Sequence, residues 1–254
     1  MDVSYLDLTG QVALVTGGSR GIGKAIALTF ADAGADVAVS SRKLPDLEEV
    51  ADEIRGMGRR ALAVAAHNRK PEELRQLVDA VKEEFGRIDI LVNNAAANPV
   101  MAPLVEIEQW AYDLIMETNV RGYFLLSQMA AQLMIEQGGG NILNISSAGG
   151  VKPDEGLGIY CVSKAAINML TRALALELGP YNIRVNALAP AVVKTRFSQA
   201  IWSNEAIMQM VMDRTPLKRI SEPEEVARMA LALVSDAAAY ITGQIVVMDG
   251  GGLL

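Results

Sequence analysis

Short apolar runs rich in β-branched residues alternate with longer helical patterns along this chain, and this alternation constrains its fold more than any other feature. Seven runs have the length and composition of strands: 11–16, 36–41, 61–66, 88–93, 141–146, 183–188 and 244–248. Helical patterns lie between them: 23–33, 46–56, 71–85, 109–137, 159–179 and 223–234. Strands that are apolar along their whole length are typical of sheets covered by helices on both faces. The alternation predicts an α/β fold with a parallel, doubly wound, seven-stranded sheet of the Rossmann type.

The length and charge of the chain limit its organisation and its partners. Its 254 residues suffice for one sizeable core, so we predict a single domain over residues 1–254. The formal net charge of −7 disfavours nucleic acid and anionic membranes as partners. Cys161 is the only cysteine, the first residues form no signal peptide, and no apolar run is long enough to cross a membrane. We therefore expect a cytoplasmic protein without an internal disulfide.

One connection, residues 191–221, is longer than the others and contains many apolar side chains. They include Phe197, Ile201, Trp202, Met208 and Met212. Loops of this length inside a compact domain are usually functional. Two interpretations remain open: a helical face packed on the core, or a mobile lid over a substrate pocket.

A glycine-rich turn follows the first predicted strand and leads into the first predicted helix. Its sequence, residues 16–23, is Thr-Gly-Gly-Ser-Arg-Gly-Ile-Gly. Gly17 permits a tight turn, while Gly21 and Gly23 let the backbone approach a pyrophosphate and let the helix pack on the sheet. The helix start adds free N–H groups and a partial positive charge. The turn predicts a dinucleotide site.

The end of the second predicted strand decides which dinucleotide is preferred. An acidic residue there binds a ribose 2′-hydroxyl and repels a 2′-phosphate. This chain has Ser41, Arg42 and Lys43 instead, and Arg20 of the glycine turn lies close to the same ribose in this fold. Because two guanidinium groups and a hydroxyl suit a phosphate, we predict NADP(H) as the cofactor. The alternative is that Arg42 and Lys43 belong to a solvated loop.

Tyr160 and Lys164 are four residues apart in a predicted helix, so their side chains share one face. A free tyrosine, with a pKa of about 10, is a poor acid at neutral pH. A nearby ammonium group favours the phenolate, so we expect Lys164 to lower the pKa of Tyr160. Ser147 follows the fifth predicted strand, where open α/β sheets bind ligands, and its hydroxyl can stabilise charge on a reacting oxygen. Ser146 is an alternative by sequence alone.

Together, the glycine turn, Ser147 and Tyr160-x-x-x-Lys164 resemble the short-chain dehydrogenase/reductase family, and the resemblance covers the whole chain. It implies an oxidoreductase in which Tyr160 exchanges a proton with the substrate oxygen and Ser147 polarises that oxygen. It also implies that Lys164 tunes the tyrosine and holds the nicotinamide ribose, and that Asn119 helps to relay protons to the lysine through water. The chemistry needs no metal, and we see no Cys/His cluster that would bind one.

The resemblance also implies the cofactor contacts and shows where this chain departs from the family. The expected contacts are Gly17, Ser19, Arg20, Gly21, Ile22, Gly23, Ser41, Arg42, Lys43, His67, Asn68, Asn94, Ala95, Tyr160, Lys164, Pro190, Val193 and Thr195. Ala96 replaces the usual glycine after the fourth strand, and His67-Asn68 replaces an aspartate that often contacts adenine. Ala191 replaces the glycine of a Pro-Gly-x-x-x-Thr segment near the nicotinamide. Because alanine disfavours a positive φ, the path of that loop stays open.

Within the family, the chain looks most like the NADP-dependent carbonyl reductase branch related to the peroxisomal retinal and dicarbonyl reductases. This likeness rests on residues 39–43, 94–99, 183–190 and 194–202. It implies, with the apolar 191–221 segment, that the substrate is an apolar ketone, aldehyde or diketone. The expected substrate contacts are Ser147, Tyr160, Phe197 and Trp202.

Two other functions remain open. One is a 3-oxoacyl-[acyl-carrier-protein] reductase, for which we would expect arginines that bind the acidic carrier; Gly138 and Tyr181 stand at the two expected places. The other is an NADP-sensing module without catalysis, which would not need to keep Tyr160. Most family members are homotetramers. The resemblance therefore implies one interface through helices 109–137 and 159–179, and another through the last strand and helix 223–234.

Overall fold

The computed structural model describes residues 4–254 and contains one sheet of seven strands. The strands are β1 (Val12–Thr16), β2 (Asp36–Ser41), β3 (Ala61–Ala65), β4 (Ile90–Asn93), β5 (Gly140–Ile145), β6 (Ile183–Pro190) and β7 (Ile245–Met248). Their order across the sheet is β3-β2-β1-β4-β5-β6-β7, and every neighbouring pair is parallel. The winding reverses between β1 and β4, which confirms the predicted doubly wound Rossmann-type fold.

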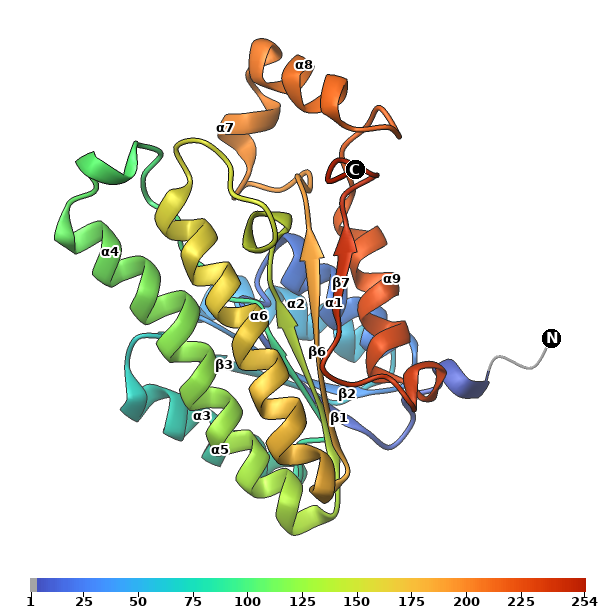
Figure 1. The fold of residues 1–254 in the computed structure, drawn as a ribbon. Helices are drawn as coiled ribbons and strands as arrows, with labels where there is room; N and C mark the ends of the chain where they lie inside the picture. Colours follow the sequence, from blue (N-terminus) through green and yellow to red (C-terminus); the bar gives the residue numbers. More distant parts are fainter. Residues whose placement is uncertain (1–3) are drawn as a thin grey trace.

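Helices cover both faces of the sheet (Figure 1). One face carries α1 (Gly21–Asp32), α2 (Leu44–Gly56) and α9 (Pro223–Val234); the other carries α3 (Pro71–Phe85), α5 (Gly122–Gln137) and α6 (Gly158–Leu178). Neighbouring residues of β1 point to opposite faces of the sheet. Val15 belongs to the same core cluster as Phe30 of α1, whereas Leu14 belongs to the other cluster, with Leu126 of α5. This burial on both sides explains the continuous apolar character of the strands. No helix in residues 4–254 has the length and apolar character needed to span a bilayer.

The predicted helix over residues 109–137 is interrupted in the structure. It consists of α4 (Gln109–Met116), a π-helical turn (Glu117–Arg121) and α5. The axis continues through the turn, but the wider turn presents Thr118 and Asn119 as buried side chains. Short 3-10 turns occupy Ser4–Leu6, Leu104–Glu106, Ala148–Gly150, Gly179–Tyr181 and Asp236–Ala238.

The long connection after β6 forms two helices, α7 (Gln199–Trp202) and α8 (Glu205–Arg214), which stand above the carboxyl ends of β6 and β7 (Figure 1). Neither helix contains a fully buried residue, so they are not a packed core face. The two ends of the connection are joined, because Lys194 N donates to Ser221 O at 2.9 Å and Ser221 N donates to Val192 O at 3.1 Å. The segment is therefore a loop closed at its base that projects beyond the sheet.

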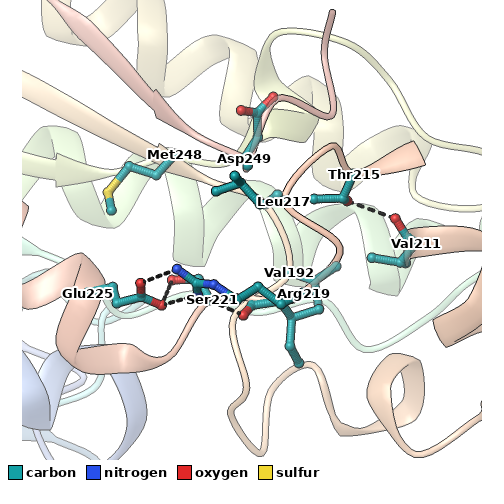
Figure 2. Close-up of a pocket in the computed structure, with 12 residues that line it drawn as sticks. Val192, Val211, Thr215, Leu217, Arg219, Ser221, Glu225, Met248 and Asp249 are labelled. Carbon is teal, nitrogen blue, oxygen red and sulfur yellow. Dashed lines mark hydrogen bonds and ion pairs between the residues drawn. The ribbon is translucent and has the colours of Figure 1, made fainter. Parts of the chain in front are cut away.

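A cavity of about 170 Å³ lies between this projecting segment and the strand ends (Figure 2). Val211 of α8 and Met248 of β7 line it, together with residues that follow α8. Arg219 and Glu225 form a bidentate ion pair at its edge, with both N–O distances 2.7 Å. The cavity lies under α8 and is not lined by Ser147, Tyr160 or Lys164, so the lid over a substrate pocket stays a prediction.

Candidate active site

The glycine turn and α1 form a cradle at the carboxyl end of β1. Gly17 has a φ of +64°, a conformation that favours glycine. A Cβ on Gly23 would lie 2.3 Å from Gly17 O, so the turn and the helix approach each other too closely for any larger residue. Arg20, the residue before α1, makes no side-chain cap, and within residues 4–254 no side chain accepts a hydrogen bond from the amides of the first helical turn. Such a helix start is suited to bind an anion.

The segment after β4 holds this cradle in place. Asn94 Nδ2 donates to Thr16 O at 2.9 Å and to Gly17 O at 3.3 Å. The Thr16 hydroxyl accepts hydrogen bonds from the amides of Asn94 and Ala95, at 3.0 and 3.2 Å. A Cβ on Gly17 would collide with Asn94 Nδ2 at 2.7 Å. Asn94 and Ala95, predicted to contact the cofactor, therefore also lock the conformation of the glycine turn.

The basic residues that were predicted to select the cofactor gather at the carboxyl ends of β1 and β2. Gly18 N donates to Ser40 O at 3.1 Å, which brings the glycine turn against the end of β2. Arg20, Arg42 and Lys43 are exposed, and none of them forms an ion pair with another residue of the described chain. Their positive charge is therefore available to an anionic ligand at this edge of the sheet.

His67 and Asn68 follow β3 at the same edge. His67 is half-buried, and its Nδ1 accepts a hydrogen bond from Arg69 N at 3.2 Å. Burial, and then the charges of Arg69 and Arg42, lower the pKa of His67. Asn68 is buried against Gly122 of α5, and its Nδ2 has no hydrogen-bond partner. The structure thus places His67 beside the cations, whereas the Asn68 side chain packs under α5.

The predicted catalytic side chains converge beyond the carboxyl end of β5. Lys164 on α6 is 1% exposed, and its Nζ donates to Ile145 O at 2.7 Å. Its Nζ lies 5.7 Å from the centre of the Tyr160 ring. Ser147 is the second residue after β5, and its Oγ accepts a hydrogen bond from Gly149 N at 3.1 Å. Ser146 points elsewhere, because its Oγ donates to Asn168 Oδ1 at 2.6 Å, so the choice of Ser147 over Ser146 fits the geometry.

The pKa of Tyr160 is raised in this structure, and not lowered as the sequence predicted. Burial raises the pKa of Tyr160 to about 12, and a hydrogen bond with Ser147 opposes only part of that rise. Burial also lowers the pKa of Lys164 to about 7, so the lysine is only partly charged at neutral pH. Desolvation disfavours the charged form of each group. Tyr160 is consequently a protonated phenol at neutral pH, and without a bound cofactor it is a weaker acid than a free tyrosine.

Asn119 lies in the π-helical turn, a rare local structure that is frequent at functional sites. Its Oδ1 accepts from Ala97 N at 2.8 Å, and its Nδ2 donates to Ala97 O at 3.1 Å and to Ser163 Oγ at 3.0 Å. Ser163 Oγ in turn donates to Tyr160 O at 2.7 Å. Asn119 therefore joins the segment after β4 to the helix that carries Tyr160, and it makes no direct hydrogen bond to Lys164.

The segment after β6 closes the site from the opposite side. Ala191 does not adopt a positive φ, and its N–H donates to Met248 O at 3.0 Å, so the loop follows a path that needs no glycine. Val193 is buried. A Cβ on Gly21 would lie 3.2 Å from Thr195 Cγ2, which places Thr195 directly against the glycine turn. Pro190, the last residue of β6, and Val193 thus bring Thr195 to the cofactor cradle.

The two predicted lid contacts have different roles in the geometry. The ring centre of Phe197 lies 6.1 Å from that of Tyr160, so Phe197 borders the tyrosine that is predicted to be catalytic. Trp202 instead donates its indole N–H to Thr195 O at 2.8 Å and ties α7 to the base of the lid. Ser198, which sequence reasoning gave no role, accepts from Thr195 N at 3.3 Å and donates to Val193 O.

Two further residues of the site were missed from the sequence. Tyr123 on α5 is fully buried, donates its hydroxyl to Ile145 O at 3.3 Å and has its ring centre 5.4 Å from Lys164 Nζ. Ser163 connects Asn119 to Tyr160. In the sequence, Tyr123 lies in an apolar helical segment, so nothing distinguishes it from a residue that only packs in the core. The position of Ser163 three residues after Tyr160 was the only available signal.

These features fit a nicotinamide dinucleotide. The narrow glycine cradle and the uncapped start of α1 suit a pyrophosphate. Thr195 and Asn94 border the cradle, and the cations at the end of β2 lie where an adenosine ribose is bound in folds of this kind. The residues that would hold the nicotinamide end are Lys164 and Tyr160, beyond the end of β5.

The chain is similar to known proteins over most of its length. A family model described as enoyl-(acyl carrier protein) reductase matches residues 17–252. The dehydrogenase/reductase SDR family member 4 of Sus scrofa is 39% identical over 244 residues, 96% of this chain and 88% of that protein.

Two solved structures are similar over nearly the whole chain. A 7α-hydroxysteroid dehydrogenase complexed with NADH and 7-oxo glycochenodeoxycholic acid has a TM-score of 0.95 at 37% identity, covering 99% of this chain and 98% of the other. A gluconate 5-dehydrogenase from Burkholderia cenocepacia, in complex with NADP and tartrate, has a TM-score of 0.95 at 31% identity, covering 98% of both chains.

Proposed function

The chain belongs to the short-chain dehydrogenase/reductase family, and on that premise we propose that it uses NADPH to reduce an apolar ketone, aldehyde or diketone to an alcohol. Proteins of this family are oxidoreductases that act on CH–OH and C=O groups and bind a nicotinamide cofactor. The observation that carries the proposal is the convergence of Tyr160, Ser147 and Lys164 beyond the carboxyl end of β5. A protonated phenol next to a serine hydroxyl is what carbonyl reduction requires of the protein.

Each side chain has one task in this reaction. The Tyr160 hydroxyl donates its proton to the carbonyl oxygen as that oxygen becomes an alkoxide. The Ser147 hydroxyl donates a hydrogen bond to the same oxygen and stabilises its developing charge. The chemistry that the nicotinamide supplies when bound is hydride transfer to the carbonyl carbon. Lys164, fixed by Ile145 O, contributes partial positive charge beside the tyrosine and favours the phenolate that forms once the proton has left.

The preference for NADPH is supported by the charges at the end of β2. Ser41, Arg42 and Lys43 stand where an acidic residue would select NADH, and Arg42 and Lys43 are exposed without ion-pair partners in the described part of the chain. Similar structures hold either NADH or NADP, so the family alone does not choose between them. Substituting both Arg42 and Lys43 with alanine should raise the KM for NADPH at least tenfold and leave that for NADH nearly unchanged.

The apolar substrate class is supported by Phe197 beside Tyr160 and by the lid that residues 191–221 form over the strand ends. We regard residues 1–254 as one domain that includes this lid. Trp202 anchors the lid to Thr195 and need not touch the substrate itself. A cytoplasmic location remains a prediction from the sequence.

A substrate attached to an acyl carrier protein is the second candidate, because the description of the matching family model names an acyl carrier protein. Gly138 and Tyr181, at the two places where an acidic carrier would need arginines, supply no positive charge. A 3-oxoacyl-[acyl-carrier-protein] reductase is therefore the alternative, and the NADP-sensing module without catalysis is a third reading.

One assay separates these three functions. NADPH consumption is measured with a panel of apolar ketones, diketones and 3-oxoacyl thioesters, with NADH and with the variant Tyr160→Phe as controls. We expect turnover of ketones or diketones that falls at least a thousandfold in Tyr160→Phe, while NADPH binding persists. Activity confined to thioesters would establish the alternative, and tight NADPH binding without any turnover would establish the sensor.

A homotetramer is supported by apolar side chains left exposed on the outer helices. Val162, Met169 and Leu176 repeat every seven residues along α6 and are 50%, 61% and 81% exposed. This spacing places them in one stripe. Phe124 of α5 and Trp110 of α4 add exposed apolar surface on the neighbouring helices. We propose that these helices form one of the interfaces between copies of the chain.

A further inference from the structure

The only histidine of the chain lies at the end of the sheet that carries the cofactor-selecting cations. Ala66 N donates to Ser41 O at 2.9 Å, so Arg42 and His67 follow the paired ends of the neighbouring strands β2 and β3. Gly18 N donates to Ser40 O, which adds the glycine turn to the same edge. The pairing of β2 with β3 therefore places His67 at the same edge of the sheet as Arg42.

The surroundings of His67 are predominantly cationic. The charge of Arg42, at the end of β2, acts on His67, as do the charges of Arg69 and Lys70 in the segment that enters α3. Glu73 is the one carboxylate among the groups that act on it, and this carboxylate is already engaged. Its Oε1 pairs with Lys70 Nζ at 2.7 Å, and its Oε2 accepts from His67 N at 2.8 Å.

This environment keeps His67 neutral in the absence of a ligand. Because Nδ1 accepts from Arg69 N, the neutral ring carries its proton on Nε2, and a second proton on Nδ1 would break that hydrogen bond. Half-burial and the charges of Arg69 and Arg42 act in the same direction and lower the pKa of His67. The charged groups that act on His67 are positive overall, so they disfavour a protonated ring. A ribose 2′-phosphate, with a charge of about −1.5 to −2 at neutral pH, would supply the negative charge that favours it.

We infer that His67 is a proton-linked member of the 2′-phosphate subsite: it becomes protonated when a 2′-phosphate binds beside Arg42, and it stays neutral when the ribose carries a free hydroxyl. The inference rests on the NADPH preference proposed above. The proton comes from solvent and forms an N–H bond on the imidazole. Binding of a 2′-phosphorylated nucleotide therefore takes up a proton, and the selection against unphosphorylated nucleotides strengthens as the pH falls from 8 to 6.5.

The test follows the single histidine directly. The protein is labelled with carbon-13 histidine, and the ring resonance of His67 is titrated by NMR without ligand, with adenosine 5′-monophosphate, and with adenosine 2′,5′-bisphosphate. The two nucleotides differ only in the 2′-phosphate. We expect the midpoint to lie below 6.5 without ligand, to change little with the monophosphate, and to rise by about one pH unit or more with the bisphosphate. One unit corresponds to a tenfold change in relative affinity.

A matched variant gives a second readout. His67→Asn keeps an oxygen that can accept from Arg69 N but removes the titrating group. Calorimetry at pH 7 in buffers of different ionisation enthalpy should show proton uptake with the bisphosphate for the original protein and none for the variant. Binding of the bisphosphate without a rise of the His67 midpoint would overturn the inference alone. If the bisphosphate binds no better than the monophosphate, the NADPH preference fails and the inference fails with it.

Discussion

At the scale of single residues, the chemistry of the site depends on burial more than on pairing. Lys164 and Tyr160 lie on one face of α6, yet burial moves both pKa values toward the neutral forms. Burying an ionisable group without a full counter-charge disfavours its charged form. The buried Nζ of Lys164 donates a hydrogen bond to the carbonyl oxygen of Ile145, which is a neutral acceptor and not a counter-charge.

This burial predicts how the free energy of unfolding depends on pH. The pKa of Lys164 is about 7 in the folded protein and returns to about 10.5 on unfolding, so the unfolded state binds more protons between these values. Stability contributed by this group therefore rises with pH from about 7 to 10, by at most about 1.4 kcal/mol per pH unit. Urea unfolding at pH 7, 8 and 9 should show this rise relative to Lys164→Met. Equal pH dependence in the two proteins would contradict the shift.

At the scale of secondary-structure elements, the turn between β1 and α1 is fixed by close backbone contacts. Gly23→Ala would place a Cβ 2.3 Å from Gly17 O and 2.5 Å from Asn94 Nδ2. We expect NADPH binding to be lost or weakened more than a hundredfold, because the turn must open to accommodate the methyl group. Gly56→Ala at the end of α2 is the control, since nothing lies within 4 Å of its added Cβ. Fluorescence titration with NADPH should separate the two variants.

The lid makes a different prediction at this scale. Trp202→Phe keeps an aromatic ring on α7 but removes the N–H that donates to Thr195 O. A neutral hydrogen bond contributes about 1 kcal/mol, so the substrate KM should rise several-fold through a looser lid. The chemical step, which relies on Tyr160 and Ser147, should keep its kcat within about a factor of three. Gln209→Ala on the exposed face of α8 serves as the control, and a fall in kcat at unchanged KM would refute the anchoring role.

At the scale of the whole molecule, the exposed apolar stripe of Val162, Met169 and Leu176 on α6 leads us to predict an interface between copies of the chain. Leu176→Glu places a charge in the stripe, and sedimentation should show a species of lower mass than that of the original protein because an unpaired charge at an apolar interface is costly. Met57→Glu introduces the same charge at an exposed methionine after α2, and it should leave the mass unchanged. A monomeric original protein would rule out the proposed assembly.

The sequence by itself determined the layer architecture, because apolar runs and helical patterns report which faces must be buried. It also determined the glycine turn and the spacing of Tyr160 and Lys164, since these depend on local backbone geometry. Only the tertiary structure decided the upward shift of the Tyr160 pKa, the π turn around Asn119 and the glycine-free path at Ala191. Each of these depends on groups that are far apart in the chain and that bury a side chain or form hydrogen bonds with it. Burial and distant hydrogen-bond partners cannot be deduced from the local sequence.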